Sequence, residues 1–486
     1  MKMTVRLRYA PSPTGHLHIG GARTALFNYL YAMHHQGTFI LRIEDTDLER
    51  NVANAADEFA ENLRWLGIEW QEGYQVGGPF GPYTCMERLG IYRDHVDKLV
   101  QAGRAYPCFC TEEELTAVRE KQQSEGITPH YIGTCRTRSE NERALRMERG
   151  DAYTIRFQVP EHAVSFVDIV RGEMQFEPEH VGGDFVIVKS NGVPVYNFAV
   201  TVDDMLMEIT HVIRGEEHIS NTPRQLYLYE AFGANPPMFG HVPLILGANG
   251  KKLSKRDESI VQFIDQYKAL GYLPDAIFNF LALLGWSPGG EREIMTKQEL
   301  IERFDLERVS KSGAFFDAAK LQWMNGHYLR SADPAALLDQ ARVTLSGSGV
   351  MVPDDAWLRD FLSLVLEKVT QLTEIEGFAR SFLAEEVTFD DDAAKTLALP
   401  HANTVIEGLL GILGTSCDGT ADGFKAVIRR VQEETKLKGK DLFMPIRAAL
   451  TGTLHGPDLN RSLALIGCER CVKRARQALV KSKSLG

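Results

Sequence analysis

The residues best suited to chemistry on a phosphate lie in one glycine-rich turn near the N-terminus. The turn reads Pro11-Ser-Pro-Thr-Gly-His-Leu-His-Ile-Gly-Gly21 and separates an alternating apolar stretch from a helical pattern. Free backbone N–H groups and the positive end of a helix dipole favour an anion there. His16 and His18 stand at its edge, where an imidazole can donate to a phosphate that gains charge. An ordinary strand-turn-helix corner has the same local pattern, so the four residues from His18 onward do not decide between the two.

A basic loop in the middle of the chain is a second candidate for phosphate chemistry. Residues 247–257 read Gly-Ala-Asn-Gly-Lys-Lys-Leu-Ser-Lys-Arg-Asp, with four cations in the six positions from Lys251 to Arg256. Two glycines favour mobility, and the charge suits a polyphosphate leaving group, which makes Lys252 and Lys255 candidate catalytic residues. A solvated basic turn is the alternative.

Three charged side chains lie within or directly after predicted buried strands. They are Arg8, Glu44 and Arg214. Parallel strands end at one edge of a sheet, where open α/β folds bind ligands, so we expect these groups to meet. Glu44 suits an ammonium group and the arginines suit carboxylates. A structural ion-pair network would use the same residues.

A cysteine-containing segment predicts a small metal site. Cys108 and Cys110 form a Cys-x-Cys pair, and Tyr131 and Cys135 follow later in the chain. Thiolates with one oxygen or nitrogen ligand are typical of zinc, with His130 as an alternative fourth ligand. Buried free thiols remain the other interpretation.

The elements that must position these groups follow from periodicity. Strands over 5–9, 38–43 and 211–218, separated by helical patterns, predict a buried parallel sheet, with 241–246 as its last strand. Further strands predict an insertion with its own β layer, over 153–157, 164–170, 185–189 and 194–200. Only helices are expected after about residue 331.

Composition limits the class of protein. A chain of 486 residues is too long for one core, so several domains are expected. No apolar stretch fits export or membrane insertion, and seven cysteines without a disulfide-like framework agree with a reducing compartment, so we expect a cytoplasmic protein. The net charge is −11, yet the residues from Lys425 onward carry 14 Lys and Arg against 5 Asp and Glu. A basic tail on an acidic body fits a local nucleic-acid contact, although a solvated helical surface would have the same composition.

Taken together, these motifs resemble the bacterial glutamyl-tRNA synthetases, a family of class I aminoacyl-tRNA synthetases, in order and spacing. The matching segments are the turn from Pro11 to Arg23, Ile43-Glu-Asp-Thr-Asp47, Val212-Ile-Arg-Gly-Glu216, Lys252-Leu-Ser-Lys-Arg256 and Leu442-Phe-Met-Pro-Ile-Arg447. The resemblance implies a multidomain fold: an N-terminal Rossmann-type parallel sheet with an α+β insertion, then an all-α anticodon-binding region.

The resemblance also implies roles for individual residues. The catalytic set is His18, Lys252 and Lys255. The ATP-binding set is Pro11, Thr14, Gly15, His18, Gly20, Gly21 and Lys255. The glutamate-binding set is Arg8, Ser12, Glu44, Tyr196 and Arg214, with Arg8 on the γ-carboxylate because a guanidinium gives a carboxylate two parallel hydrogen bonds. Mg²⁺ is expected with ATP, and zinc on Cys108, Cys110, Tyr131 and Cys135.

The implied domains and partners complete the expectation. The catalytic domain takes 1–85 and 197–250, an acceptor-end-binding insertion 86–196, a stem-contact domain 251–330, and helical anticodon-binding subdomains 331–385 and 386–486. The partners are tRNA(Glu), L-glutamate and ATP, with no membrane, and the chain is expected to be a monomer.

Competing functions differ in testable ways. A non-discriminating enzyme would also charge tRNA(Gln), and a catalytically altered relative would bind tRNA without charging it. A small adenylyltransferase would not need the long region after the lysine loop. A glutaminyl enzyme usually carries a β-barrel anticodon domain, which the helical tail argues against.

Overall fold

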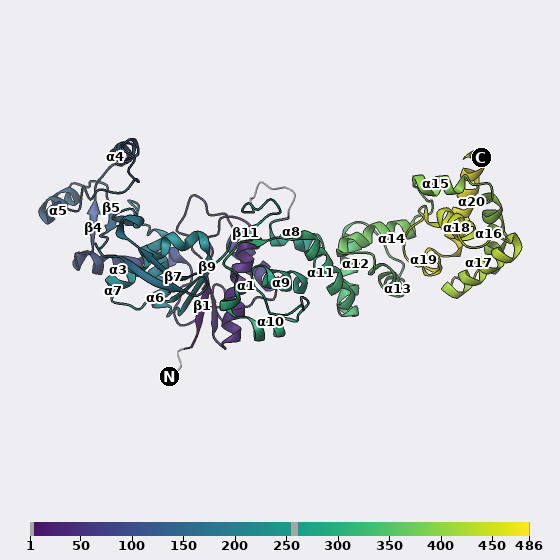
Figure 1. Ribbon diagram of the computed structural model, residues 1–486, viewed down its shortest axis with the longest axis horizontal. Coiled ribbons are helices and arrows are strands. Elements are labelled where there is room, and N and C mark those ends of the chain that lie inside the picture. The colour runs from purple at the N-terminus through teal and green to yellow at the C-terminus, as the bar shows by residue number, and fades with distance from the viewer. Residues whose placement is uncertain (1–3, 254–260, 486) are drawn as a thin grey trace. The chain divides into compact units, whose positions relative to one another are not determined.

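Seven strands form the central sheet of the computed structural model, which describes residues 4–253 and 261–485 (Figure 1). The strand order is β3-β2-β1-β9-β10-β6-β7, and every neighbouring pair is parallel except β6 and β7. Their bounds are β1 Arg6–Tyr9, β2 Thr38–Leu41, β3 Glu72–Gly73, β6 Val164–Asp168, β7 Gly172–Phe176, β9 His211–Gly215 and β10 Met238–Val242. This confirms the predicted parallel-dominated α/β fold.

The direction of chain progression reverses at the centre of this sheet. From β1 the chain adds β2 and then β3 on one side, whereas β9 and β10 lie on the other side of β1. Ligands of open α/β sheets bind outside the carboxyl ends of the strands at such a reversal. The ends of β1 and β9 are therefore the expected location of a site.

Helices cover the two faces of the sheet differently (Figure 1). On one face α1 (Ile19–His34) packs against β1 and β2, with α9 (Pro274–Leu283) and α10 (Lys297–Arg303) beyond it. On the other face α3 (Leu89–Gln101), α6 (Tyr196–Leu206) and α7 (Thr222–Phe232) share one apolar core with β2, β9 and β10. Successive residues of a strand point to opposite faces. Tyr9 accordingly points toward α1, while Arg8 points toward α6.

The segment predicted as an insertion contributes to two sheets. A three-stranded antiparallel sheet contains β4 (Ala105–Cys108), β5 (Thr154–Phe157) and β8 (Phe185–Val188). The strands β6 and β7 instead extend the large sheet, because Asp168 pairs with Phe239 of β10. The expectation that the predicted strand 164–170 belongs to a separate β layer was therefore wrong, since alternation shows that a strand exists but not which sheet it joins. The strands β4 and β7 were not predicted. Helices α2 (Ala55–Trp65), α4 (Glu112–Ser124) and α5 (Glu140–Glu148) lie in the same half of the chain.

Two predicted strands differ from the structure. Residues 194–200 were expected to be extended, but Tyr196 begins the helix α6. Phe198 to Val202 are all buried, and an apolar run that is buried on several sides does not distinguish a helix from a strand by periodicity. The predicted last core strand, 241–246, is divided: β10 ends at Val242, and β11 (Ile245–Leu246) pairs with β12 (Ala314–Phe315) in a separate two-stranded sheet.

The chain divides into two compact units. The first comprises Met1–Tyr267 and Pro274–Ala318, and the second comprises Lys268–Leu273 and Ala319–Gly486. Helix α8 (Ile264–Ala269) lies at a point where the chain changes unit. Short 3-10 turns occur at η1 Cys85–Arg88, η2 Pro178–Val181, η3 Glu216–Asn221, η4 Leu306–Arg308 and η5 Leu372–Glu374.

The second unit is helical throughout its described residues, as the sequence predicted. Its helices are α11 (Ala318–Ser331), α12 (Pro334–Gly347), α13 (Asp355–Val365), α14 (Ile375–Leu383), α15 (Asp391–Leu397), α16 (Ala402–Ser416), α17 (Ala421–Thr435), α18 (Lys440–Thr451), α19 (Leu459–Ile466) and α20 (Cys468–Leu485). A disulfide joins Cys417, after α16, to Cys468, the first residue of α20. The expectation of unpaired cysteines was wrong here, because residues 51 positions apart meet only once the helices pack.

No single helix within the described ranges is long and apolar enough to cross a membrane. Helices α15 and α16 pass that test only as a pair, and they are bent by 87°.

Candidate functional site

The glycine-rich turn forms the beginning of α1, and His18 is the N-cap of that helix. Its Nδ1 accepts a hydrogen bond from the Gly20 N–H at 3.0 Å. Because Nδ1 is an acceptor, the proton of a neutral ring lies on Nε2, which is 3.2 Å from Oε1 of Gln262. A cap of this kind satisfies one of the free N–H groups of the first helical turn. The same imidazole therefore orders the turn and presents an N–H donor at its edge.

The two glycines of the turn have different surroundings. A Cβ added to Gly21 would lie 2.6 Å from Tyr9 Oη, so glycine here lets α1 approach β1 closely. A Cβ added to Gly20 would meet His18 Nδ1 at 3.4 Å, which is ordinary contact distance. Gly15 has φ +142°, a backbone conformation that side chains rarely adopt.

The segment after the lysine-rich loop pairs with this turn. Ile19 donates its N–H to the Gln262 carbonyl at 2.9 Å, and Ile264 donates to the Leu17 carbonyl at 3.0 Å. The Phe263 ring meets the His18 ring edge-on with 5.8 Å between centroids. The N-terminal side of the loop is also hydrogen-bonded to the rest of the protein, because Leu253 donates its N–H to the Ile245 carbonyl at 3.0 Å. The residues on both sides of the loop therefore belong to the first compact unit, and those that follow the loop pack against His18.

Of the two predicted catalytic lysines, the structure describes Lys252 but not Lys255. Lys252 is described and forms an isolated bridge with Leu246. Lys255 lies outside the described residues, so the structure gives no position for it.

Arg8, Glu44 and Arg214 meet beneath the carboxyl ends of their strands. All three are buried, with exposed fractions of 3%, 2% and 5%. Glu44 donates its backbone N–H to the Pro11 carbonyl at 2.9 Å, which places it beside the glycine-rich turn and Ser12. Charges on Arg214, Glu44 and Arg8 all act on the hydroxyl of Tyr196, whose pKa burial raises. The structure therefore brings the predicted amino-acid site together.

A buried carboxylate that the sequence did not identify holds this group in place. Asp204, on α6, accepts from Arg8 Nε at 2.9 Å and from Arg8 Nη2 at 3.1 Å. It also lies 2.8 Å from Arg42 Nη2, which in turn donates to Glu44 at 2.9 Å. Burial opposes the charge on Asp204, but Arg8 and Arg42 outweigh it and lower the pKa of Asp204. The signal that could have found this network was Arg42 itself, a charge inside an apolar strand.

Two atoms of the site are buried without a hydrogen-bond partner. One is Oε2 of Glu44, an acceptor, and the other is Nη1 of Arg214, a donor. The remaining Arg214 nitrogens are used, with Nε 3.1 Å from His241 Nε2 and Nη2 2.8 Å from Thr222 Oγ1. Unsatisfied buried polar groups are rare and costly in native proteins. A ligand that carries both an ammonium group and a carboxylate has the donor and the acceptor that would satisfy this pair.

Burial makes the carboxyl group of Glu44 a weaker acid than usual. Desolvation raises the pKa of Glu44 to about 7, although the neighbouring Arg42 guanidinium acts in the opposite direction. Burial likewise lowers the pKa of Arg214. A ligand with both charges would offset these desolvation costs.

The three predicted cysteine ligands converge in the insertion. One ligand atom from each of Cys108, Cys110 and Cys135 lies within 4.8 Å of the others. The Sγ atoms of Cys110 and Cys135 are 3.6 Å apart, close to the roughly 3.8 Å edge of a tetrahedron with Zn–S bonds of about 2.3 Å. Tyr131 Oη lies 3.4 Å from Cys108 Sγ and 3.7 Å from Cys110 Sγ. His130 does not join this group, since its Nδ1 lies against the Thr128 carbonyl at 3.0 Å.

The electrostatic environment differs among the thiols of the cluster. Arg156 donates from Nε to Cys108 Sγ at 3.3 Å. Burial opposes ionisation of Cys135, but the Phe109 N–H and Arg138 outweigh it and lower the pKa of Cys135. Burial raises the pKa of Cys110 to about 12, so that thiol would lose its proton only on binding a metal. The donor set fits a zinc ion.

Comparison with known proteins places this geometry in context. A family model described as the catalytic domain of class I tRNA synthetases (E and Q) matches residues 4–323, and an anticodon binding domain model matches residues 331–479. A glutamate–tRNA ligase of Geobacillus thermodenitrificans is 51% identical over 486 residues, covering 99% of both chains, as is one of Geobacillus stearothermophilus. A crystal structure of a glutamate tRNA ligase from Elizabethkingia meningosepticum in complex with its amino acid superposes with a TM-score of 0.90, at 36% identity, covering 98% of this chain and 99% of the other.

Proposed function

Because this chain belongs to the class I tRNA synthetases of the E and Q type, we propose that it attaches L-glutamate to the 3′ end of tRNA(Glu) at the expense of ATP. Two full-length relatives at 51% identity bear the name glutamate–tRNA ligase. The reaction passes through a glutamyl-adenylate and releases pyrophosphate and then AMP.

The observation that carries the proposal is the pair of unsatisfied buried atoms in the amino-acid site. The glutamate ammonium donates to Oε2 of Glu44, and its α-carboxylate accepts from Nη1 of Arg214. Each contact replaces a desolvation cost with a charge-assisted hydrogen bond. Tyr196 and Ser12 complete the walls.

Arg8 is the residue we assign to the γ-carboxylate. Asp204 occupies Nε and one N–H of Nη2, which fixes the plane of the guanidinium. Nη1 and the second N–H of Nη2 remain for two parallel bonds to a carboxylate. A glutamine side chain offers one acceptor oxygen and one NH₂ donor, and the donor would oppose the guanidinium. The buried cation thus favours glutamate over glutamine.

The first chemical step is attack of the glutamate α-carboxylate on the ATP α-phosphorus. His18 Nε2–H, which lies 3.2 Å from Gln262 Oε1 in the free protein, stabilises the charge that grows on the phosphate, and the positive end of the α1 dipole acts in the same direction. Lys252 and Lys255 stabilise the departing pyrophosphate, and Pro11, Thr14, Gly15, Gly20 and Gly21 line the nucleotide. Mg²⁺ enters with ATP and reduces the charge of its phosphates.

The second step transfers glutamate to tRNA. A terminal ribose hydroxyl attacks the mixed anhydride, the bond to AMP breaks, and the AMP phosphate accepts the proton. No covalent intermediate with the protein is needed. We assign the insertion to the acceptor end, with zinc on Cys108, Cys110, Tyr131 and Cys135 as a structural ion, region 251–330 to the tRNA stem, and the basic helical tail to the anticodon.

The deciding experiment is aminoacylation with radiolabelled glutamate. We expect charging of purified tRNA(Glu), and a parallel reaction with tRNA(Gln) identifies a non-discriminating enzyme if it is also charged. Lys255→Ala should slow adenylate formation and spare tRNA binding. Binding of tRNA without charging by the wild-type chain would establish the catalytically altered relative and reject the proposal.

A further inference from the structure

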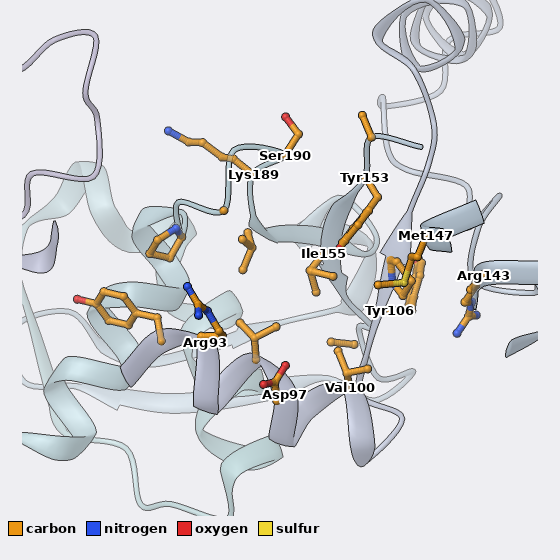
Figure 2. Close-up of a pocket in the computed structure, with 18 of the residues that line it drawn as sticks. Arg93, Asp97, Val100, Tyr106, Arg143, Met147, Tyr153, Ile155, Lys189 and Ser190 are labelled. Atoms are coloured by element: carbon orange, nitrogen blue, oxygen red, sulfur yellow. The ribbon is translucent and has the colours of Figure 1, made fainter. Parts of the chain in front are cut away.

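A cavity of about 800 Å³ lies in the insertion, away from all residues assigned above (Figure 2). Its walls are one face of α3, the helix α5, the sheet β4-β5-β8 and the turn after β8. None of the residues proposed for glutamate, ATP or zinc lines it. The volume lies in the range of about 300–1,000 Å³ that is typical of small-molecule sites.

The polar and apolar groups of this cavity are separated along α3. Arg93, Asp97 and Val100 line it from successive turns of the helix, which span about 10 Å at 1.5 Å per residue. Figure 2 shows Arg93 and Lys189 toward one end and Tyr106, Met147 and Tyr153 toward the other, with Asp97 and Ile155 between them. The cavity thus has Arg93 and Lys189 at one end and Asp97 in its middle. The other end combines aromatic and apolar side chains with the cation Arg143.

The charged groups Arg93 and Asp97 on α3 are exposed to solvent in the structure. Arg93 and Asp97 are one turn apart, yet neither forms an ion pair or a side-chain hydrogen bond with any residue that the structure describes. At the other end Met147 is 44% exposed and Val100 is 38% exposed, and both line a cavity that is open to solvent on one side. Helix α5 contributes no buried residue of its own. These side chains are arranged around a volume that they do not fill.

We propose that this cavity binds a nucleotide at a second site, separate from the ATP site. The phosphate accepts charge-assisted hydrogen bonds from Arg93, with Lys189, whose Nζ lies 3.4 Å from the Thr46 carbonyl, as a second cation at the same end. Asp97 accepts from the ribose hydroxyls, a role that acidic residues fill in nucleotide-binding folds. The base lies among Tyr153, Met147 and Ile155, where stacking and apolar contact do not require a particular base. A phosphate, a ribose and a base follow one another in the same order as the three parts of the cavity.

Binding of N-methylanthraniloyl-AMP, a fluorescent nucleotide, tests this site in the full-length chain. The proposed reaction site is first saturated with a non-hydrolysable glutamyl-sulfamoyl adenosine. We expect one further equivalent of the fluorescent nucleotide to bind and unlabelled AMP to displace it. Failure to bind any further equivalent would overturn the inference.

Matched variants locate the binding. Arg93→Ala should weaken it at least tenfold through loss of a bond to a charged group, and Ala144→Trp should block the apolar end. Lys98→Ala on the same helix and Leu145→Trp on α5 change residues that do not line the cavity, so both should bind like the wild type. Wild-type binding by Arg93→Ala and Ala144→Trp would place the nucleotide elsewhere.

Two further measurements separate the remaining outcomes. Displacement of the fluorescent nucleotide by equimolar tRNA would assign the cavity to a nucleotide of an RNA strand and overturn a free nucleotide as its occupant. Charging of tRNA(Glu) is measured in parallel for each chain. Normal charging without a second bound nucleotide rejects this inference alone, whereas absence of charging rejects the proposed function independently.

Discussion

Glu44 is the residue whose ionisation should control the affinity for glutamate. Its pKa of about 7 in the free protein means that it is largely protonated at pH 6 and largely ionised at pH 8. Only the ionised form attracts the substrate ammonium. We therefore predict that kcat/KM for glutamate falls as pH decreases below 7, by about tenfold for each pH unit.

The matching control is Glu44→Gln. It should have a much lower kcat/KM at pH 8 and lack the acidic limb between pH 8 and 6. The measurement is initial-rate aminoacylation with tRNA and ATP saturating. An unchanged acidic limb in this variant would assign the titration to another group.

Asp204 should be one of the most destabilising positions to neutralise. Asp204→Asn leaves Arg8 and Arg42 buried without their shared carboxylate, and breaking a buried pair of this kind costs about 3–5 kcal/mol. We expect a large decrease in the urea midpoint of the catalytic unit. Asp47→Asn removes an ion pair with the exposed Arg50 and should shift the midpoint far less. Equal shifts would show that the buried network does not stabilise the fold.

At the scale of single residues, the sequence predicted which charged groups meet but not the residues that hold them in place. Arg8, Glu44 and Arg214 could be identified because each lies at the end of a strand and carries a charge that a buried strand does not otherwise need. Asp204 could not, because its segment was expected to begin as a strand. The position of Asp204 beside Arg8 depends on how α6 packs against β1, and the local sequence pattern does not predict that packing.

His18, the N-cap of α1, orders the first turn of the helix, and we propose that it also donates to the phosphate; substitution can separate these two roles. His18→Asn keeps a side-chain acceptor for the Gly20 N–H but removes the ring N–H, whereas His18→Ala removes both. We predict that both variants lose about 10²–10³-fold in the rate of adenylate formation. Only the alanine variant should also lose about 1 kcal/mol of stability.

Pre-steady-state adenylate formation and thermal unfolding measure these two effects. If His18→Asn formed adenylate at the wild-type rate, His18 would act only as a helix cap.

The helices α16 and α20 carry a covalent link that the sequence did not predict. The disulfide closes a loop over 51 positions that contains α17, α18 and α19. Constraint of the unfolded chain by such a loop is worth about 4 kcal/mol in the chain-entropy model. We predict that a reductant lowers the unfolding temperature of the oxidised chain.

Cys417→Ser is the control for this prediction. Its unfolding temperature should be low with or without dithiothreitol, and calorimetry on both chains makes the comparison. No response of the oxidised wild-type chain to the reductant would show that the bond does not stabilise the helical unit.

Helices and strands were predicted correctly where the hydrophobic periodicity favoured one of them clearly. The prediction failed where an apolar run was compatible with both. The strands β1, β2 and β9 and the helices of the second unit have clear periodicity, and they were predicted. The short β3 was not predicted, and β10 overlaps the predicted strand 241–246 only at its end. The helix α6 is buried on several sides and was mistaken for a strand. The strand β6 lies within the predicted strand 164–170, whereas β7 (Gly172–Phe176) was not predicted. The sheet that β6 joins depends on Asp168 meeting β10, a contact between distant parts of the chain.

For the whole molecule, the uneven charge predicts how salt affects the reaction. The tail from Lys425 onward carries 14 basic and 5 acidic residues in a chain of net charge −11. If this tail contacts tRNA phosphates, the affinity for tRNA should fall steeply and log-linearly between 50 and 200 mM salt, as counterions are no longer released favourably. The KM for glutamate should change little, because its ion pairs are buried and poorly screened. Filter binding and aminoacylation at matched salt measure both, and an equal salt dependence would exclude phosphate contacts as the main source of tRNA affinity.

The central position of β1 has a consequence for how the protein is made. Arg6, in β1, bonds to Thr210 just before β9, and these residues are 204 positions apart. While the ribosome is still elongating the chain toward β9, β1 can pair with β2 alone and keeps one open edge, the kind of edge that recruits foreign strands. We therefore expect nascent chains whose β9 has not yet left the exit tunnel to depend on chaperones. This dependence should end once β9 has emerged and can pair with β1.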